Sequence, residues 1–290
     1  MQCRSNGAAL VEHRARKRFG QNFLHDQNII HRIVRAIRPQ PGDTLLEIGP
    51  GQGAITSELL DSGCQLHALE LDRDLVEILT RKFGDRSNFH LQQGDALKLD
   101  IQRLIDTAQL PPATQLRVVG NLPYNISTPL IFHLLAQSAH IADMHFMLQK
   151  EVVERLAALP NNKEYGRLGI MTQYFCRIEP IIEVPPGAFS PQPKVQSAVV
   201  RLTPYAALPH PAKSVENLQR VVRAAFSQRR KTLRNALQTL LNADDISACD
   251  IDPGARPETL SLPQYVALAD RLGNDAAADI ESATRMNISE

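Results

Sequence analysis

The chain has 290 residues, 43% of them hydrophobic and 22% charged, and its formal net charge is +1. These values are ordinary for a globular protein, and no apolar run approaches the ~20 residues that a membrane-spanning helix requires. The four cysteines lie far apart without metal-type spacing, so we expect a cytoplasmic protein with no metal site, no disulfide framework and no membrane association.

Short apolar runs alternate with helical patterns over the first two thirds of the chain, which is typical of a parallel sheet flanked by helices. Strands are predicted at Thr44–Ile48, Gln65–Leu71, Asn88–Gln92, Leu116–Gly120 and Met144–Leu148, followed by a possible hairpin at Ile178–Val184 and Ser197–Leu202. Helices are predicted at Asn28–Ile37, Ile55–Leu60, Asp74–Lys82, Pro129–Ala136, Glu151–Ala158 and Arg167–Phe175. This pattern predicts a doubly wound, mostly parallel α/β sheet of the Rossmann-like type, with ligands at the carboxyl ends of the strands.

The composition changes near Pro204, where a stretch rich in proline and alanine indicates a linker. Beyond it, helical patterns cover Val215–Phe226, Thr232–Leu241 and Leu262–Leu272, without convincing strands. We therefore predict two domains: a Rossmann-like domain over residues 1–205 and a small all-α domain over residues 206–290.

A glycine-rich turn follows the first predicted strand, with Glu47 ahead of Gly49, Gly51 and Gly53. Glycines at alternate positions let the backbone turn sharply and approach a ligand closely. The spacing differs from the dinucleotide pattern G-x-G-x-x-G. Glu47 is a poor neighbour for a phosphate but suits a cationic amino-acid group. A tight turn without a ligand is the alternative.

Two acids end the next two predicted strands. Glu70 comes about twenty residues after the glycine turn, where a carboxylate can accept hydrogen bonds from both ribose hydroxyls. Asp95 ends the third strand, where it can accept from an adenine amine. Each acid alone would be an ordinary loop residue, but the series indicates a pocket for S-adenosylmethionine.

The stretch Asn121-Leu122-Pro123-Tyr124 follows the fourth predicted strand and indicates the chemistry. An adenine amine is a poor nucleophile because its lone pair is delocalised into the ring, and two hydrogen-bond acceptors can free that pair. The side-chain carbonyl of Asn121 and the main-chain carbonyl of Leu122 are such acceptors, and Pro123 keeps Leu122 extended. Tyr124 offers a face on which an extruded base can stack, worth ~1–3 kcal/mol. A proline turn with Tyr124 packed in the core is the alternative.

Phe189 is a second candidate wall for the base, because three prolines from Pro186 to Pro193 stiffen its loop. A buried packing residue is the alternative for this position.

Two basic clusters also indicate a surface for a polyanion, although a solvated helix face is an alternative. Their members are Arg14, Arg16, Lys17 and Arg18 near the N-terminus and Arg223, Arg229, Arg230, Lys231 and Arg234 near the C-terminus. All of these except Arg14 and Arg223 are predicted to bind RNA.

These features resemble the ribosomal RNA adenine N6,N6-dimethyltransferases over nearly the whole chain. The matching segments include residues 16–24 (RKRFGQNFL), the glycine turn, residues 70–72 (ELD), 120–127 (GNLPYNIS), 147–152 (MLQKEV), 165–168 (YGRL), 193–195 (PKV), 197–202 (SAVVRL) and 229–232 (RRKT). One departure is Asp250, where the family usually has a glycine before Ile251-Asp252-Pro253. This departure lies outside the catalytic loop and concerns only the second predicted domain.

The resemblance implies a class I S-adenosylmethionine-dependent methyltransferase. Asn22 and Leu24 would border the methionine end of the cofactor, and Gly49, Glu70, Asp95 and Asn121 would complete its site. The substrate would be two adjacent adenosines in a hairpin loop near the 3′ end of 16S rRNA, within an immature small ribosomal subunit. The basic segment from Arg229 to Arg234 would contact rRNA, and we expect a monomer.

Three other functions have to be weighed against this one. A large-subunit rRNA methyltransferase that confers antibiotic resistance would share the cofactor and catalytic loops, but the C-terminal half, with Arg229-Arg230-Lys231-Thr232, favours the small subunit. A non-catalytic assembly factor would not need the intact loop from Asn121 to Tyr124. The glycine spacing disfavours a nicotinamide dehydrogenase.

Overall fold

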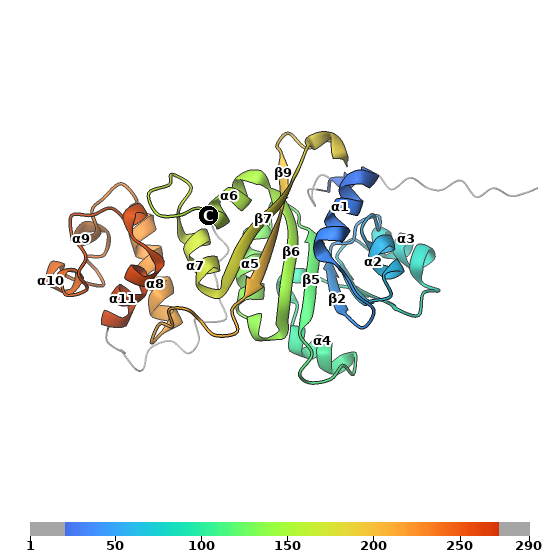
Figure 1. Cartoon of the computed structure of the whole chain (residues 1–290), viewed down its shortest axis with the longest axis horizontal. Helices are drawn as coiled ribbons and strands as arrows, with labels where there is room; N and C mark the ends of the chain where they lie inside the picture. The colour runs from blue at the N-terminus through green and yellow to red at the C-terminus, as the bar shows by residue number, and fades with distance from the viewer. Residues whose placement is uncertain (1–20, 273–290) are drawn as a thin grey trace, which may run out of the picture.

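A seven-stranded, mostly parallel sheet forms the middle of the molecule (Figure 1). The computed structural model describes residues 21–272, and its strand order is β4-β3-β2-β5-β6-β9-β7. The strands are β2 (Thr44–Ile48), β3 (Gln65–Glu70), β4 (Phe89–Gln93), β5 (Leu116–Asn121), β6 (Ile141–Gln149), β7 (Cys176–Val184) and β9 (Ser197–Pro204). The chain winds outward from β2 to β4 and then returns to β5, so the strand order switches direction between β2 and β5. A crevice at the carboxyl ends of these two strands is the expected ligand site of such a sheet.

Helices cover both faces of the sheet and enclose two apolar cores. The first face carries α1 (Gln27–Ile37), α2 (Thr56–Asp61) and α3 (Arg73–Phe83), and the second carries α4 (Ile101–Thr107), α5 (Ser127–Leu135) and α6 (Lys150–Ala157). Strand β3 shows how one strand serves both cores, because Leu66 and Ala68 belong to the first and Leu69 to the second.

Local sequence explains why α1 forms where it does. The side chain of Asp26 accepts hydrogen bonds from the backbone N–H groups of Asn28 and Ile29, and so caps the helix N-terminus. Four isoleucines at helical spacing then face the sheet, at positions 29, 30, 33 and 37. The helix ends at Arg38, whose φ of 53° lies in the left-handed region.

The C-terminal part of the described chain is helical and has a third core of its own. Its helices are α8 (Val215–Ser227), α9 (Leu233–Ala236), α10 (Ala243–Ser247) and α11 (Leu262–Arg271), which Figure 1 shows at one end of the molecule. Helix α7 (Arg167–Phe175) also contributes Ile170, Met171 and Tyr174 to this core. The helical region therefore packs directly on α7, and a division at residue 205 stays a prediction.

The predicted sheet is confirmed, including the antiparallel pair formed by β7 and β9. The predicted helix at Thr232–Leu241 is wrong, because only the single turn Leu233–Ala236 is helical. The N–H groups of Leu233 and Arg234 donate to the carbonyls of Ala255 and Pro253, which ties this turn to a neighbouring loop. The short elements that the patterns missed are β1 (Phe23–Leu24), β8 (Phe189–Ser190), α4 and α10. Within residues 21–272, every helix is too short or too polar to traverse a membrane.

Candidate cofactor and catalytic site

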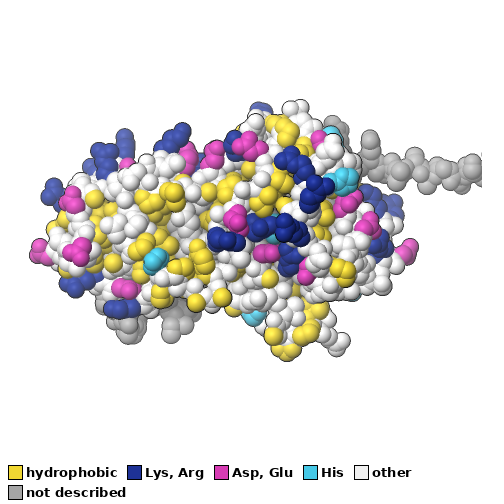
Figure 2. All heavy atoms as spheres, viewed as in Figure 1, with side chains coloured by type: hydrophobic (Ala, Val, Ile, Leu, Met, Phe, Trp, Pro, Cys, Tyr) yellow, Lys and Arg dark blue, Asp and Glu magenta, His cyan; other side chains and the backbone are white. Residues whose placement is uncertain are grey.

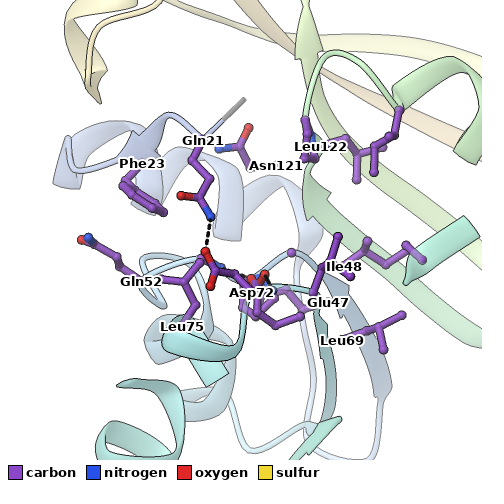
Figure 3. A pocket seen from close by; sticks show the side chains of 18 of the residues that line it. Gln21, Phe23, Glu47, Ile48, Gln52, Leu69, Asp72, Leu75, Asn121 and Leu122 are labelled. Atoms are coloured by element: carbon purple, nitrogen blue, oxygen red, sulfur yellow. Dashed lines mark hydrogen bonds between the residues drawn. The ribbon is translucent and has the colours of Figure 1, made fainter. Parts of the chain in front are cut away.

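A pocket opens at the carboxyl ends of β2, β3 and β5, where the sheet topology predicts it. Its walls come from four loops and from the segment that precedes α1 (Figure 3). The lining includes all the predicted cofactor residues, namely Asn22, Leu24, Gly49, Gly51, Glu70, Asp95 and Asn121, and also Leu122, Pro123 and Tyr124. Ten predicted residues from distant parts of the sequence therefore lie around one cavity.

The glycine turn follows β2 in a conformation that other residues rarely adopt. Gly49, Gly51 and Gly53 have φ angles of 66°, 62° and 82°. A Cβ atom on Gly53 would lie 2.5 Å from the ring of Phe83, and one on Gly51 would lie 3.2 Å from the ring of Phe23. Backbone angle and space both require glycine here, so the turn brings bare backbone to the floor of the pocket.

Glu70 is held firmly at the end of β3 and remains able to bind a ligand. Its side chain is buried, with one oxygen accepting from the N–H of Gly51 at 3.2 Å and the other from the N–H of Asp72 at 2.9 Å. A carboxylate oxygen has two lone pairs, so each oxygen can accept a further hydrogen bond from a hydroxyl. Burial raises the pKa of Glu70, which is the expected effect of a dry pocket on a carboxyl.

Glu47 lies deeper than Glu70, at the end of β2. Only 3% of its surface is exposed, and its carboxylate accepts a hydrogen bond of 2.7 Å from the hydroxyl of Thr56. Burial raises the pKa of Glu47 to about 7, and the nearby charge of Glu70 adds to this effect. Two acids on one cavity wall favour a cationic ligand group and disfavour a phosphate.

Asp95 and Leu71 define the part of the pocket beside β4. One oxygen of Asp95 accepts from the N–H of Leu97 at 3.0 Å, which leaves the other oxygen for a ligand. Leu71 also lines the pocket and is 50% exposed, an unusual state for a large apolar side chain. Sequence analysis missed Leu71, although its place directly after Glu70 was a usable signal. An apolar side chain and a carboxylate that line the same pocket suit a purine.

The segment before α1 closes the pocket from above. Gln21 donates to the carboxylate of Asp72 at 3.1 Å, and Figure 3 shows its side chain reaching across the cavity. Strand β1 pairs with β8, so that Leu24 lies opposite Phe189. Sequence analysis included Asn22 and Leu24 but missed Gln21 and Asp72, because their contact joins residues 51 positions apart.

The amide of Asn121 has a defined orientation. Its Nδ2 donates to the main-chain carbonyl of Asn22 at 3.1 Å. Because a carbonyl can only accept, the nitrogen must face Asn22 and Oδ1 must face away from it. No hydrogen bond within residues 21–272 occupies this Oδ1. An acceptor thus remains available at the pocket wall.

The residues around Asn121 fix the rest of the predicted catalytic loop. Gly120 allows β5 and β2 to approach closely, since a Cβ atom there would lie 2.6 Å from the carbonyl oxygen of Ile48. The N–H of Leu122 donates to the carbonyl of Met147 on β6 at 3.2 Å. The hydroxyl of Tyr124 bonds to that of Ser197 on β9 at 3.0 Å. Three neighbouring strands therefore hold this loop, and Ser197 is a contributor that sequence analysis did not identify.

Phe189 does not line the pocket, where its predicted contact with the base would place it. Its side chain is 3% exposed, belongs to the first apolar core and is not part of the pocket lining. The position agrees with the packing alternative, because pairing between β1 and β8 directs Phe189 toward Leu24. A role against the base stays a prediction.

The predicted RNA-binding residues divide into three groups. Arg16, Lys17 and Arg18 lie outside the described residues. Arg230, Lys231 and Arg234 are exposed on the helical region. Arg229 is half-buried, donates to the carbonyl of Asn162 at 3.3 Å and lies 3.9 Å from a carboxylate oxygen of Glu258. Arg229 thus takes part in internal packing.

Chemically, the pocket combines acceptors for ribose, an adenine amine and a cationic amino-acid group with a free amide oxygen. S-adenosylmethionine carries the first three of these groups, so the residues present fit it. Within the described part of the chain, no three His, Cys, Asp or Glu side chains gather as a metal site would require.

Comparisons with known proteins agree with this geometry. The family model described as ribosomal RNA adenine dimethylase matches residues 12–273. A Pseudomonas aeruginosa protein named Ribosomal RNA small subunit methyltransferase A is 61% identical over 263 residues, covering 91% of this chain and 96% of that protein. A protein of the same name from Marinobacter nauticus is 56% identical over 262 residues, covering 90% and 93%.

Solved structures give the same picture of the fold. A dimethyladenosine transferase from Plasmodium falciparum has a TM-score of 0.72 at 24% identity, covering 85% of this chain and 95% of that one. The 23S rRNA methyltransferase ErmE has a TM-score of 0.66 at 26% identity, covering 87% and 99%.

Proposed function

Because the chain belongs to the ribosomal RNA adenine dimethylase family, we propose that it methylates two adjacent adenosines in a hairpin loop near the 3′ end of 16S rRNA. The methyl groups come from S-adenosylmethionine, and the products are N6,N6-dimethyladenosines made during small-subunit biogenesis. The 61% identity to a small-subunit enzyme, against 26% to the large-subunit enzyme ErmE, favours this substrate over 23S rRNA.

The pocket residues have distinct parts in binding the donor. Glu70 accepts from the ribose hydroxyls, Asp95 accepts from the adenine amine, and Leu71 packs against the purine. Asn22 and Leu24 border the methionine end, where the ionised carboxylate of Glu47 attracts the cationic group. Bound S-adenosylmethionine supplies an electrophilic methyl group, so no strong base is needed.

The amide of Asn121 carries the catalytic proposal. Its Oδ1 is free while its Nδ2 is anchored, so the side chain can accept from the substrate amine without rearranging. The carbonyl of Leu122 accepts the second amine N–H, and together the two acceptors draw the nitrogen lone pair out of the ring. Tyr124 stacks on the extruded base, and its bond to Ser197 limits the movement of the ring.

The substrate surface extends beyond the pocket. We assign rRNA contacts to Arg16, Lys17 and Arg18 and to the exposed Arg230, Lys231 and Arg234. Arg229, which sequence analysis grouped with them, contributes by holding this segment against Asn162. The partner is the immature small subunit, and the protein acts as a monomer in the cytoplasm.

One experiment tests the reaction and its substrate together. The purified protein is incubated with labelled S-adenosylmethionine and immature small subunits that lack the modification, and the modified nucleotides are mapped. Two neighbouring adenosines near the 3′ end of 16S rRNA should each gain two methyl groups, whereas large subunits should gain none. Label in 23S rRNA, or no transfer to either subunit, would refute the proposal.

A further inference from the structure

The outward face of α1 carries positive charge without acids. Arg32 and Arg35 are both exposed and lie three residues apart, so they are neighbours on one side of the helix. Between residues 27 and 42 the chain contains no aspartate or glutamate. The opposite face of α1 is buried against the sheet, so these arginines can only point outward.

Further arginines continue this charge onto the amino-terminal end of the parallel strands. Arg201 of β9 donates to the carbonyl of Ala36 at 2.7 Å, which brings β9 against the end of α1. Arg177 of β7 reaches the same place through Glu179, which lies 3.1 Å from Arg177 and 3.9 Å from Arg201. Figure 2 shows Lys and Arg side chains gathered over α1 and over these strands, with acidic side chains beside some of them.

Part of this cluster has an internal structural role. Arg117 pairs with Asp43 at 2.8 Å and with Asp143 at 3.0 Å, and it also donates to the carbonyl of Ile37. Together with Arg201 it satisfies carbonyls at the C-terminus of α1, where a helix favours positive charge. Contacts within the fold therefore account for the charges of Arg117 and Arg201.

Contacts within the described part of the fold do not account for the charges of Arg32, Arg35 and Arg38. Within residues 21–272 none of these three side chains forms an ion pair. The carbonyls of Ala36 and Ile37 at the end of α1 already have donors, and the apolar face already anchors the helix. Like charges three residues apart repel each other weakly, so these arginines cost the free protein some stability. An external polyanion removes that cost.

Helix α1 connects the pocket with these arginines, because its first turn lies near the pocket. The helix begins at Gln27, three residues after Leu24, which lines the pocket, and its eleven residues extend about 16 Å away from it. We propose that Arg32, Arg35 and Arg38 form a second rRNA-binding surface, which contacts the phosphate backbone that leads away from the target adenosines. This inference rests on the proposed function, and it adds a contact on the sheet side of the molecule to those on the helical region.

The test compares two double variants of the full chain. R32Q/R35Q removes two charges from the proposed surface. R81Q/R103Q removes two exposed arginines from α3 and α4, outside it. Binding to immature small subunits is measured without the methyl donor over a series of salt concentrations. R32Q/R35Q should lower the slope of log K against log salt by about 1.4–1.8 and weaken binding at least ten-fold at about 0.1 M salt. R81Q/R103Q should match the unmodified protein.

Each result has a defined meaning. Circular dichroism should show both variants folded, since all four side chains are exposed. An unchanged slope for R32Q/R35Q, or an equal loss for R81Q/R103Q, would overturn the second surface. Methyl transfer by the unmodified protein is scored separately: its absence would refute the proposed function, whereas steep salt dependence that R32Q/R35Q reduces would still support the surface.

Discussion

In the pocket, Glu70, Asn121 and Tyr124 are each held by a hydrogen bond to a partner on another segment. In the helical region, Arg230 and Arg234 extend from the surface into solvent. A held group acts through its position, so its loss should slow the chemical step while binding changes little. An exposed charge acts through its contribution to a field, so its loss weakens binding gradually and in a salt-dependent way.

The largest effect should follow from Asn121→Ala, which tests whether the rate of methyl transfer depends on the fixed position of this amide. The variant removes the free acceptor and its anchor, and methyl transfer should fall on the order of 100- to 1,000-fold, as expected for one preorganised polar group. Binding of small subunits should change little, because almost no charge or surface is lost. Single-turnover rates at saturating donor measure the first effect and filter binding the second. Equal losses in methyl transfer and in subunit binding would show that the pocket and the helical region do not have separate roles in catalysis and in binding.

Glu47→Gln tests what the buried pocket acid costs the fold. Glu47 binds its proton more tightly in the folded state, because burial raises its pKa from 4.5 to about 7. The folded protein is therefore favoured at low pH and loses up to about 3 kcal/mol of stability as the pH rises through this interval. The variant keeps an acceptor for Thr56 and carries no charge, so it should be the more stable form at pH 8.

Thermal denaturation between pH 4.5 and 8 measures this difference. The variant should have a flatter profile than the unmodified protein, and it should bind S-adenosylmethionine more weakly. Glu216→Gln, which changes an exposed acid of α8, provides the control and should leave the profile unchanged. Parallel profiles for all three proteins would show that burial of Glu47 has no such cost.

Two adjacent arginines of the helical region should differ in how their loss affects binding and stability. Arg230→Gln should weaken subunit binding a few-fold and lower the salt slope by about 0.7–0.9, with no change in melting temperature. Arg229→Gln should also lower the free energy of unfolding, by up to about 1 kcal/mol, because it loses contacts with Asn162 and Glu258. Salt titrations and thermal melts of both variants measure these effects. A destabilised Arg230→Gln protein would contradict the assignment of Arg230 to the solvent-exposed surface.

An effect of similar size concerns the bond between Tyr124 and Ser197. Tyr124→Phe and Ser197→Ala each remove it, and each should slow transfer about five-fold, equivalent to about 1 kcal/mol. If the bond acts by orienting the ring, the double variant should be no slower than either single variant. Multiplicative losses would mean that the two hydroxyls act independently.

Most of the pocket could be predicted from sequence because its signals are local. Strand ends carry the glycine turn, Glu70, Asp95 and Asn121, and parallel strands place such ends at one edge of a sheet. The helical region was harder to predict, and the turn at Leu233–Ala236 shows why. Its backbone donors go to carbonyls of Pro253 and Ala255 about twenty residues away, a contact that helical periodicity does not encode.

By itself, the sequence determined the sheet and the strand ends that line the pocket, since backbone angles and strand ends depend on neighbouring residues. Only the tertiary structure decided which polar groups remain free. The amide of Asn121 is oriented by Asn22, 99 positions away, and Arg201 meets the carbonyl of Ala36 across 165. Hydrogen bonds over such separations depend on how whole elements pack, and within residues 21–272 that packing leaves Oδ1 of Asn121 and the side chains of Arg32, Arg35 and Arg38 without partners.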